Sequence, residues 1–583
     1  MLLFLLLEAL SFSSATKNPC VVEFGSNSSG VGVFDETFSS TPQCSYYGVC
    51  YAEAPVGSLR FMNPVLHDPR GPQNYTKQGT MCPQMNTHNG SIMGVEDCLV
   101  MDIITPFVPG PSKPTKLPVL VYIHGGSFVN GYSGLGLWKG ADLLIDKNVI
   151  VVSINYRLKV LGFLRHPEFN ITGNFGLKDQ RTALLWIQKY IHLFGGDPTR
   201  VTLMGHSAGG ASVIYHLYAK TSKGLFQQVI SLGGTMIAPW ALNYKPQGIT
   251  AELLRRLNVT LLEELQNIDY KKLFFDDRFD FSWYFTMIHD GFVPTLEDPD
   301  DPEAFITVPP HTLILDKPAS DVPLIVGQTA TEYRLMLKYL EFFIMGSYFP
   351  HKSWQPIYYD IAKLVQSKIN ASDKPDIIVQ LANLASGYYP VKRTIQHLVS
   401  QSSSPVYYFQ FEYEGRFGYL KRDQNQTNQH GAAHGDELGY IFSPLVEDEA
   451  VADRERFRTE WSVHEETVQL VSDFVKFGNP TPQVDIQPNL VWPQYSESDS
   501  TDRKYLNIGQ NLEIIPDTDS EDDLFNFYEP IYECLYYHNC DEVEVMVKSM
   551  KRTESSQFDN IVKMMCKNAG KNGAEIPDMC YAF

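Results

Sequence analysis

The chain has 583 residues, of which 44% are apolar and 20% charged, a balance that suits a globular protein with a large core. Its formal net charge is −20 at pH 7, and no block of basic residues interrupts the acidic balance. This charge argues against nucleic acid or an acidic membrane surface as the main partner. A well-solvated acidic surface explains the charge fully.

The chain begins with a short apolar run, MLLFLLLEALSFSSA, that ends in small residues. This pattern predicts a secretory signal peptide over residues 1–15, with cleavage after Ala15. No later run of about 18 apolar residues exists, so we expect no transmembrane segment. Residues 578–583 are not hydrophobic enough for a lipid-anchor signal. The protein is therefore expected to be secreted and extracellular.

N-glycosylation sequons support export. Seven asparagines precede x-Ser/Thr with x not proline, which is the acceptor pattern: Asn27, Asn74, Asn89, Asn170, Asn258, Asn370 and Asn425. Asn479 is excluded because Pro480 follows it. Several sequons behind a leader predict a glycoprotein.

Nine cysteines form two clusters, one near each end of the chain: Cys20, Cys44, Cys50, Cys82 and Cys98, then Cys534, Cys540, Cys566 and Cys580. None has a Cys-x-x-Cys spacing, so no zinc site is expected, and disulfides are the default in an oxidising compartment. We expect a disulfide between Cys82 and Cys98, which closes a loop of moderate length. The C-terminal cysteines are expected to pair among themselves. The odd count leaves one thiol free or bonded to another chain, and Cys50 is the candidate.

Near-continuous apolar runs predict strands that are buried on both faces of a parallel sheet. They occupy residues 117–124, 148–155, 200–204, 228–232, 322–326 and 406–411. Between the second and third runs, residues 179–194 carry apolar side chains at helical spacing. Strands that alternate with helices imply an α/β fold whose parallel strands are joined by crossover helices. Beyond about Asn526, four cysteines and charged stretches predict a small disulfide-bonded extension with a short amphipathic helix.

The third apolar run leads into the motif Gly205-His-Ser-Ala-Gly209, and a helix-like stretch follows over residues 211–218. This is the Gly-x-Ser-x-Gly nucleophile elbow, in which a sharp strand-to-helix turn exposes the serine oxygen. The two glycines are needed because a Cβ at either position would clash with the crowded backbone. Alone, the motif also fits an ordinary glycine-rich turn. Ser207 is therefore a candidate nucleophile that needs an oxyanion hole, an acid and a base elsewhere.

A second glycine-rich turn, His124-Gly-Gly-Ser-Phe128, follows the first predicted strand. Its backbone N–H groups, with that of the residue after the nucleophile, can hold a developing oxyanion. We assign these donors to Gly126, Ser127 and Ala208.

Further blocks make the chain resemble the type-B carboxylesterase/cholinesterase family of α/β-hydrolases. The blocks are YGVCYAEAPVGSLRF at 47–61, EDCL at 96–99, NYRL at 155–158, NFGLKDQ at 174–180 and FGGDP at 194–198. The resemblance runs from about Tyr46 to Phe527, and GHSAGGAS at 205–212 with HGDEL at 434–438 is most similar to insect-type carboxylesterases. It implies an α/β-hydrolase domain over residues 16–527, with a large, mostly parallel sheet flanked by helices, and a Cys-rich extension over 528–583. It also implies a serine carboxylesterase that acts on small carboxylic esters without a metal or organic cofactor.

The family pattern places the catalytic base on His434 and leaves His430 as an exposed loop histidine. The acid lies between serine and histidine in this fold's chain order. Glu332 has that place, after a predicted strand and turn, although Tyr333 stands where the family usually has glycine. The implied triad is Ser207, Glu332 and His434. His206 is expected to point away from the nucleophile and to pack.

Three other functions stay open. Adhesion homologues usually lack a triad residue, which this chain does not, although the Cys-rich extension leaves room for a partner or oligomer contact. A choline-ester specialist is disfavoured because residues 82–98 lack the tryptophan that holds the quaternary ammonium by a cation–π contact. A hormone-ester specialist is weakened because juvenile hormone esterases tend to carry Gln at the place of His206. Ser127 stands where the family most often has a third glycine, and we predict a preference for small acyl groups.

Overall fold

The computed structural model describes residues 19–25, 27–78, 80–86, 90–109, 116–134, 140–274, 291–332, 356–372, 377–418, 421, 430–442, 450, 452–482, 490–496, 503–518 and 523–549. The predicted signal peptide lies outside these residues, as do Asn89, Asn425, Cys566 and Cys580.

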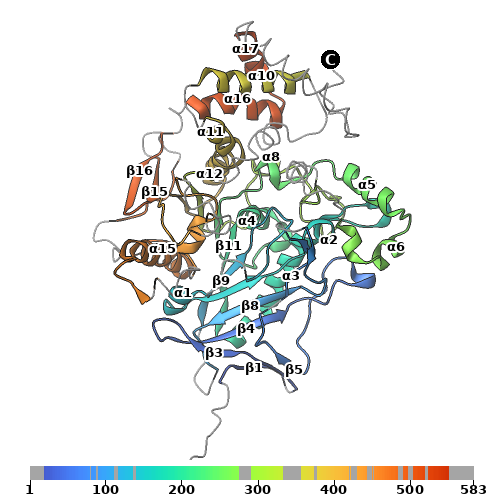
Figure 1. Ribbon diagram of the computed structural model, residues 1–583, viewed down its shortest axis with the longest axis vertical. Coiled ribbons are helices and arrows are strands. Elements are labelled where there is room, and N and C mark those ends of the chain that lie inside the picture. The colour runs from blue at the N-terminus through green and yellow to red at the C-terminus, as the bar shows by residue number, and fades with distance from the viewer. Residues whose placement is uncertain are drawn as a thin grey trace, which may run out of the picture.

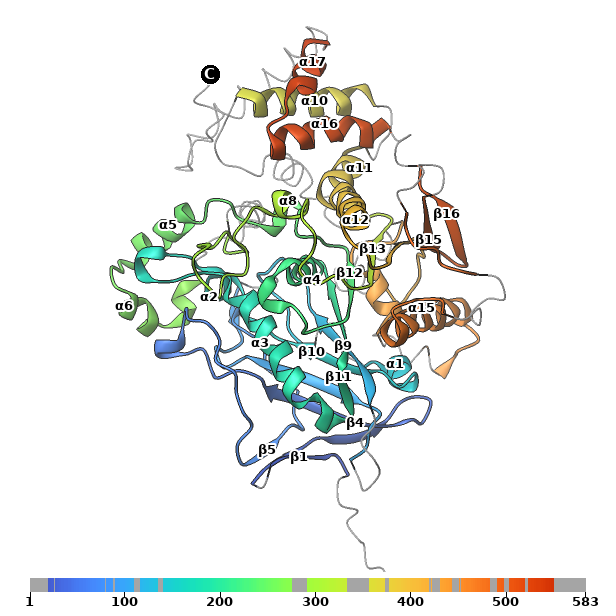
Figure 2. The same cartoon turned by 180° about the vertical axis from the view of Figure 1, so that it is seen from behind.

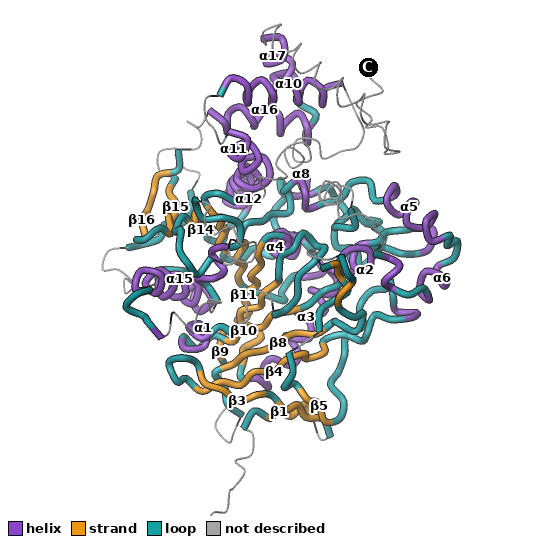
Figure 3. The backbone as a smooth tube through the Cα atoms, viewed as in Figure 1, coloured by secondary structure: helices purple, strands orange, loops and turns teal. Residues whose placement is uncertain are grey.

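A mixed sheet of eleven strands crosses the molecule as one twisted band (Figure 3). Its spatial order is β16-β15-β14-β13-β12-β11-β9-β10-β8-β4-β3. The strands are β3 (Val33–Glu36), β4 (Pro42–Cys50), β8 (Val100–Thr105), β9 (Leu117–Ile123), β10 (Ile150–Ile154), β11 (Gly196–His206), β12 (Gln228–Leu232), β13 (Leu324–Thr329), β14 (Val406–Phe411), β15 (Lys504–Ile508) and β16 (Leu512–Pro516). Strands β9 to β15 pair in parallel, and the outer strands at both edges pair antiparallel. All six predicted strands are present, and the mostly parallel sheet is confirmed.

The continuous apolar runs reflect burial on both faces of the sheet. Along β9, Val119, Val121 and Ile123 belong to one hydrophobic core, whereas Leu120 and Tyr122 belong to a second. Successive side chains of a strand point to opposite faces. A strand with a hydrophobic core on each side therefore has no polar face, and its sequence does not alternate between apolar and polar residues.

Helices supply the outer layers of both cores. The main helices are α1 (Asp142–Asp146), α2 (Lys159–Phe163), α3 (Phe175–Tyr190), α4 (Ala208–Tyr218), α5 (Gln247–Leu257), α6 (Leu262–Asn267), α8 (Pro310–Leu313), α10 (Pro356–Ala371), α11 (Ile377–Asn383), α12 (Tyr389–Gln401) and α15 (Arg458–Phe477). Helices α3, α4 and α12 contribute to the first core, and α1 and α15 to the second (Figures 1 and 2). The predicted helix over 179–194 corresponds to α3 and the short 3-10 turn that follows it.

The C-terminal elements lie at one end of the molecule, away from the N-terminal strands (Figure 1). Helix α16 (Asp523–Tyr537) is followed by α17 (Asp541–Ser549), and a Cys534–Cys540 disulfide closes the turn between them. Helix α17 packs against α10 and α16. It occupies the place of the predicted short helix. The predicted domain boundary after residue 527 falls inside α16.

Two more disulfides lie near the N-terminus. Cys20 is joined to Cys44, and Cys82 to Cys98 as expected, whereas Cys50 forms no disulfide. The sequon asparagines within the described ranges are all exposed: Asn27, Asn74, Asn170, Asn258 and Asn370. Within the part of the chain that the structure describes, no helix is both long and apolar enough to cross a membrane.

Candidate active site

Ser207 stands at the turn between β11 and α4, with φ 58° and ψ −120°. A positive φ is unfavourable for a residue with a side chain, so the surrounding structure must hold it in place. The Ser207 N–H donates to the Leu232 carbonyl at 2.7 Å, and the Ser207 carbonyl accepts from Ala211 N–H at 2.9 Å. The turn is therefore fixed between the end of β12 and the first turn of α4.

Three glycines let the backbone close around this turn. A Cβ on Gly205 would lie 2.1 Å from the Gly209 carbonyl oxygen, and one on Gly209 would lie 2.0 Å from that of Ile123. A Cβ on Gly234 would lie 2.0 Å from the Ser207 carbonyl oxygen. These contacts are far inside van der Waals distance and involve backbone atoms. They give the structural reason for the glycines of the elbow motif.

The turn proposed as the oxyanion hole lies directly beside Ser207. A Cβ on Gly125 would approach the Ser207 Cβ to 2.8 Å. The chain then turns sharply, because Gly126, Ser127 and Phe128 all have positive φ values of 105°, 55° and 61°. Gly126 and Ser127 are partly exposed, whereas Gly125 and Phe128 are buried. The turn therefore presents the backbone of Gly126 and Ser127 at the site.

Ala208 is the first residue of α4, and it is fully buried behind the nucleophile. The first N–H groups of a helix have no partner within that helix. The Ala208 N–H is therefore suited to bind a developing negative charge.

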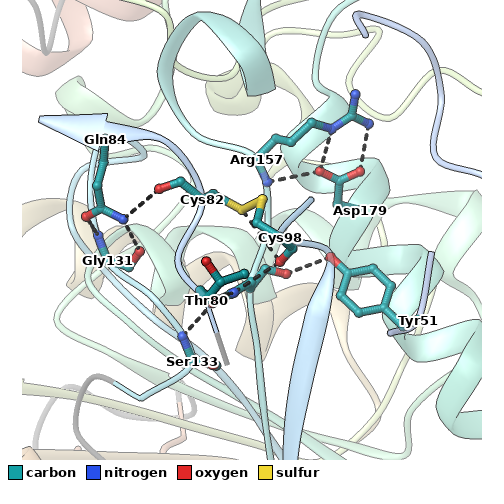
Figure 4. The surroundings of a disulfide bond; sticks show 10 residues. Tyr51, Thr80, Cys82, Gln84, Cys98, Gly131, Ser133, Arg157 and Asp179 are labelled. Carbon is teal, nitrogen blue, oxygen red and sulfur yellow. Dashed lines mark hydrogen bonds and ion pairs between the residues drawn. A yellow bond between two sulfur atoms is a disulfide. The ribbon is translucent and has the colours of Figure 1, made fainter. Parts of the chain in front are cut away.

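The Cys82–Cys98 disulfide supports the segment that follows the oxyanion turn (Figure 4). Gln84, two residues after Cys82, accepts a hydrogen bond from Gly131 N–H and donates one to the Gly131 carbonyl, both at 2.9 Å. Asn155 accepts from Ser133 N–H at 2.7 Å and donates to the Cys98 carbonyl at 3.0 Å. The disulfide-closed loop thus limits the movement of the chain just beyond Ser127.

Glu332 and His434 form a hydrogen-bonded pair. Glu332 Oε2 contacts His434 Nδ1, and Glu332 Oε1 accepts from Thr329 N–H at 2.7 Å. The His434 N–H also donates to the Glu332 carbonyl at 3.2 Å. Glu332 is 2% exposed, whereas the side chain of His434 is 17% exposed. Because Nδ1–H faces the carboxylate, the neutral imidazole keeps Nε2 as a proton acceptor.

The ends of β11 and β12 bring this pair to the nucleophile. A Cβ on Gly233 would lie 3.1 Å from Glu332 Oε1 and 3.2 Å from His434 Cε1. The next residue, Gly234, touches the Ser207 carbonyl as described above. His206, beside Ser207, packs its ring against that of His434, with centroids 4.4 Å apart. The predicted acid, base and nucleophile thus gather at the carboxyl ends of parallel strands, where α/β folds place their sites.

His430, the competing histidine, lies elsewhere. Its side chain is 90% exposed, and its Nδ1 is 3.7 Å from Glu414 Oε1. The structure therefore pairs His434, rather than His430, with the buried acid. The motif with small residues before His-Gly-x-Glu-Leu was the signal that separated them.

Two further residues lie near the base. The sequence predicts only a packing role for His206, and the ring against which it packs is that of His434. The sequence assigns no role to Glu437, whose Oε1 lies 3.7 Å from His206 Nε2. Its position three residues after His434 is the sequence feature that could have identified it. Among the residues described, no group of three or more His, Cys, Asp or Glu side chains could hold a metal ion.

A mostly parallel sheet with a nucleophile elbow at the carboxyl end of β11 defines an α/β-hydrolase. The model of the carboxylesterase family matches residues 31–525. Esterase B1 of Culex pipiens is 30% identical over 506 residues, which cover 80% of this chain and 90% of the relative. Juvenile hormone esterase of Tribolium castaneum is 29% identical over 507 residues, which cover 79% and 84%.

Solved structures agree with these relatives. The crystal structure of juvenile hormone esterase from Manduca sexta, with OTFP covalently attached, has a TM-score of 0.73 and 25% identity, covering 88% of this chain and 99% of that one. A PNB esterase structure has a TM-score of 0.68, also at 25% identity, covering 86% and 98%. The chain belongs to the carboxylesterase family, and it is a carboxylic-ester hydrolase.

Proposed function

We propose that this carboxylesterase is a secreted serine esterase that uses the triad Ser207, His434 and Glu332 and forms an acyl-serine intermediate. The observation that carries the proposal is the hydrogen-bonded Glu332–His434 pair beside the strained turn of Ser207. An imidazole held by a buried carboxylate next to a serine at an elbow is the arrangement that activates a serine nucleophile.

The reaction then follows from the roles of these groups. His434 Nε2 takes the proton of the Ser207 hydroxyl as the serine oxygen attacks the ester carbonyl. Glu332 holds the Nδ1–H tautomer and stabilises the imidazolium that forms. The imidazolium gives its proton to the departing alcohol, which leaves an acyl group on Ser207. Water activated by His434 then attacks the acyl-serine, and the acid is released.

Backbone N–H groups stabilise both tetrahedral intermediates. Gly126, Ser127 and Ala208 supply the donors, and loss of one such donor typically costs on the order of 10²–10³ in turnover. The Ser127 side chain stands where a third glycine would leave more room, so we infer a preference for small acyl groups. The disulfide-supported segment behind the turn keeps the donors in place before the substrate arrives.

Active-site labelling and two histidine variants test the triad. Ser207→Ala and His434→Ala should each lower kcat on p-nitrophenyl acetate by roughly 10⁴–10⁶-fold. His430→Ala is the matched control, because that histidine is exposed and should leave kcat within about twofold. A labelled organophosphate should modify Ser207 in the folded wild-type protein. Full activity of Ser207→Ala, or labelling of another residue, would overturn the proposal, and absence of labelling would favour an inactive recognition protein.

A hormone ester is the second candidate substrate class. Juvenile hormone esterases stand among both the relatives and the similar solved structures. His206 argues against it, because those enzymes tend to carry Gln there. A panel of p-nitrophenyl, naphthyl and juvenile hormone esters, with acetylthiocholine for comparison, separates the classes by kcat/KM. A juvenile hormone ester that exceeded every simple ester by tenfold or more would favour the specialist.

We also infer that the protein is exported and N-glycosylated. The leader over residues 1–15 and the exposure of the five described sequon asparagines support this inference. Expression in insect cells should yield protein in the medium that begins at residue 16 and loses mass on treatment with an N-glycosidase. Intracellular protein that retains Met1 would contradict the inference. A partner or oligomer contact through the extension remains a prediction, which the molar mass in solution tests.

A further inference from the structure

A second pair of acid and imidazole groups lies next to the Glu332–His434 pair. His206 is the last residue of β11, and its ring is inclined by 40° to the ring of His434 at a centroid distance of 4.4 Å. Glu437 belongs to the short 3-10 turn Asp436–Tyr440, which follows His434 directly. Its Oε1 lies 3.7 Å from His206 Nε2. The loop that carries His434 thus also carries a carboxyl group that faces the ring packed against His434.

Both members of this pair are buried, and the atoms that face each other make no hydrogen bond of ordinary geometry. Glu437 is 1% exposed and His206 is 5% exposed. Among the described residues, neither carboxyl oxygen of Glu437 nor Nε2 of His206 makes a hydrogen bond of ordinary geometry. Buried polar groups normally have partners, so an unpartnered carboxyl group beside an unpartnered imidazole nitrogen calls for an explanation.

One side of Glu437 faces an apolar cavity. It borders a cavity of about 20 Å³ whose other walls include Leu232, Leu470 and Trp492. The surface of this cavity is apolar, so on this side no polar group would solvate an ionised carboxylate. Among the residues that the structure describes, no Lys or Arg side chain forms an ion pair with Glu437, and Glu332 would add a second negative charge nearby.

These surroundings favour the uncharged form of both groups. Burial, followed by the charge of Glu332, raises the pKa of Glu437 well above its ordinary value. Burial, followed by the charge of His434, lowers the pKa of His206 well below its ordinary value. Both shifts favour the neutral forms, in which Glu437 carries an O–H donor and His206 is a neutral imidazole.

We propose that Glu437 and His206 form a neutral acid–imidazole pair that positions His434 for proton transfer, an inference that rests on the proposed triad. The Glu437 O–H donates to His206 Nε2 after closure of the present gap, which is roughly 0.5 Å beyond hydrogen-bonding distance. Glu437 touches no reacting atom. It acts through His206, so both are positioning residues.

This bond has two consequences for the site. It places the His206 proton on Nδ1, which lies 3.2 Å from where a Cβ on Gly125 would stand, at the start of the oxyanion turn. It also holds the His206 ring, whose neutral form burial favours, against the ring of His434. A charged ring at this distance would oppose the imidazolium that His434 becomes when it takes the serine proton. A neutral His206 ring therefore favours the imidazolium form of His434.

Two substitutions of Glu437 separate a donor role from simple filling of space. Glu437→Gln keeps a neutral hydrogen-bond donor, whereas Glu437→Leu keeps the volume but removes the donor. We expect Glu437→Leu to lower kcat by about tenfold to a hundredfold with KM within about twofold. Glu437→Gln should stay within about threefold of wild type. An equal loss of kcat in both variants, or no loss of kcat in Glu437→Leu, would overturn the proposed pair.

A double-mutant cycle with His206→Phe tests whether the two residues act together. Phenylalanine keeps a ring against His434 but has no nitrogen. The double variant should lose no more than about twofold beyond His206→Phe alone, and losses that multiply would overturn the coupling. The melting temperature of Glu437→Leu should equal or exceed that of wild type, because an unpaired buried polar group is removed. A fall in melting temperature of several degrees would assign Glu437 a purely structural role.

Ser207→Ala keeps this test distinct from that of the triad. If Ser207→Ala retains activity, the triad itself is wrong. If Ser207→Ala is inactive and Glu437→Leu matches wild type, only the positioning pair is wrong.

Discussion

Glu332→Gln is the perturbation that best separates the geometry of the acid–base pair from its charge. The carboxylate now has one oxygen for each of two donors, because Oε1 accepts from Thr329 N–H and Oε2 faces His434 Nδ1. A glutamine amide has only one oxygen. If that oxygen stays with Thr329, the amide N–H₂ faces His434 and forces its proton onto Nε2, which is then unable to accept the proton of Ser207. If the amide turns round, Thr329 N–H loses its partner in a buried place.

The expected loss is about 10³–10⁴ in kcat, as for other triads whose histidine is held in the wrong tautomer. This corresponds to about 4–5.5 kcal/mol of transition-state stabilisation. Initial rates on p-nitrophenyl acetate measure it, and KM should change little because Glu332 is 2% exposed and behind the base. Glu414→Gln is the matched control, since Glu414 faces the exposed His430 and should leave kcat within about threefold. A folded Glu332→Gln protein within tenfold of wild type would refute the assignment of the acid.

Three further changes probe the acyl pocket, the charge of a buried acid and the disulfide. Ser127→Gly should raise the rate on butyrate relative to acetate esters by about threefold or more, and an unchanged ratio would contradict the pocket argument. Burial raises the pKa of Asp142 to about 6, so its ionisation destabilises the fold as pH rises from about 4 through 6. Relative to wild type, the free energy of unfolding of Asp142→Asn should therefore increase by roughly 1–3 kcal/mol between pH 4.5 and pH 8, which unfolding in urea would measure. The same difference between variant and wild type at both pH values would contradict this. Joint replacement of Cys82 and Cys98 by Ser should cost about 3 kcal/mol of stability, because the two cysteines are 16 residues apart in the sequence. It should also lower kcat, and unchanged kinetics would show that the disulfide-closed loop does not support the oxyanion turn.

The central strands and the elbow could be predicted because each is encoded locally. The runs at 228–232 and 406–411 match β12 and β14 to the residue, since a strand covered on both faces is apolar along its whole length. The strands β3, β4, β8, β15 and β16 were not predicted. Strands β3 and β16 are largely exposed, β4 and β15 carry polar residues, and Asp102 interrupts the apolar run of the buried β8, so none has the continuous apolar pattern of the central strands.

The site was predicted only as far as its motifs reach. Ser207 and His434 stand in motifs whose glycines have a steric reason, and Glu332 follows from the chain order of this fold. The contact of His206 with His434 and the approach of Glu437 depend instead on where β11 ends relative to a loop far away in the sequence. No local sequence pattern indicates that these two segments meet in the fold. The Cys20–Cys44 disulfide was missed for the same reason, because its cysteines meet only once β4 has joined the sheet.

The strained residues of the site and the contacts that hold them have different origins in the chain. Ser127 and Ser207 both have positive φ, and a strained residue of this kind costs on the order of 1–3 kcal/mol. The elements that hold them are distant: the end of β12 for Ser207, and the disulfide-closed loop for the segment after Ser127. A local sequence can therefore specify that a turn is tight, but only the assembled sheet can stabilise it. Catalytic geometry at this site is for that reason a property of the whole fold, because the turn residues alone would relax to ordinary conformations.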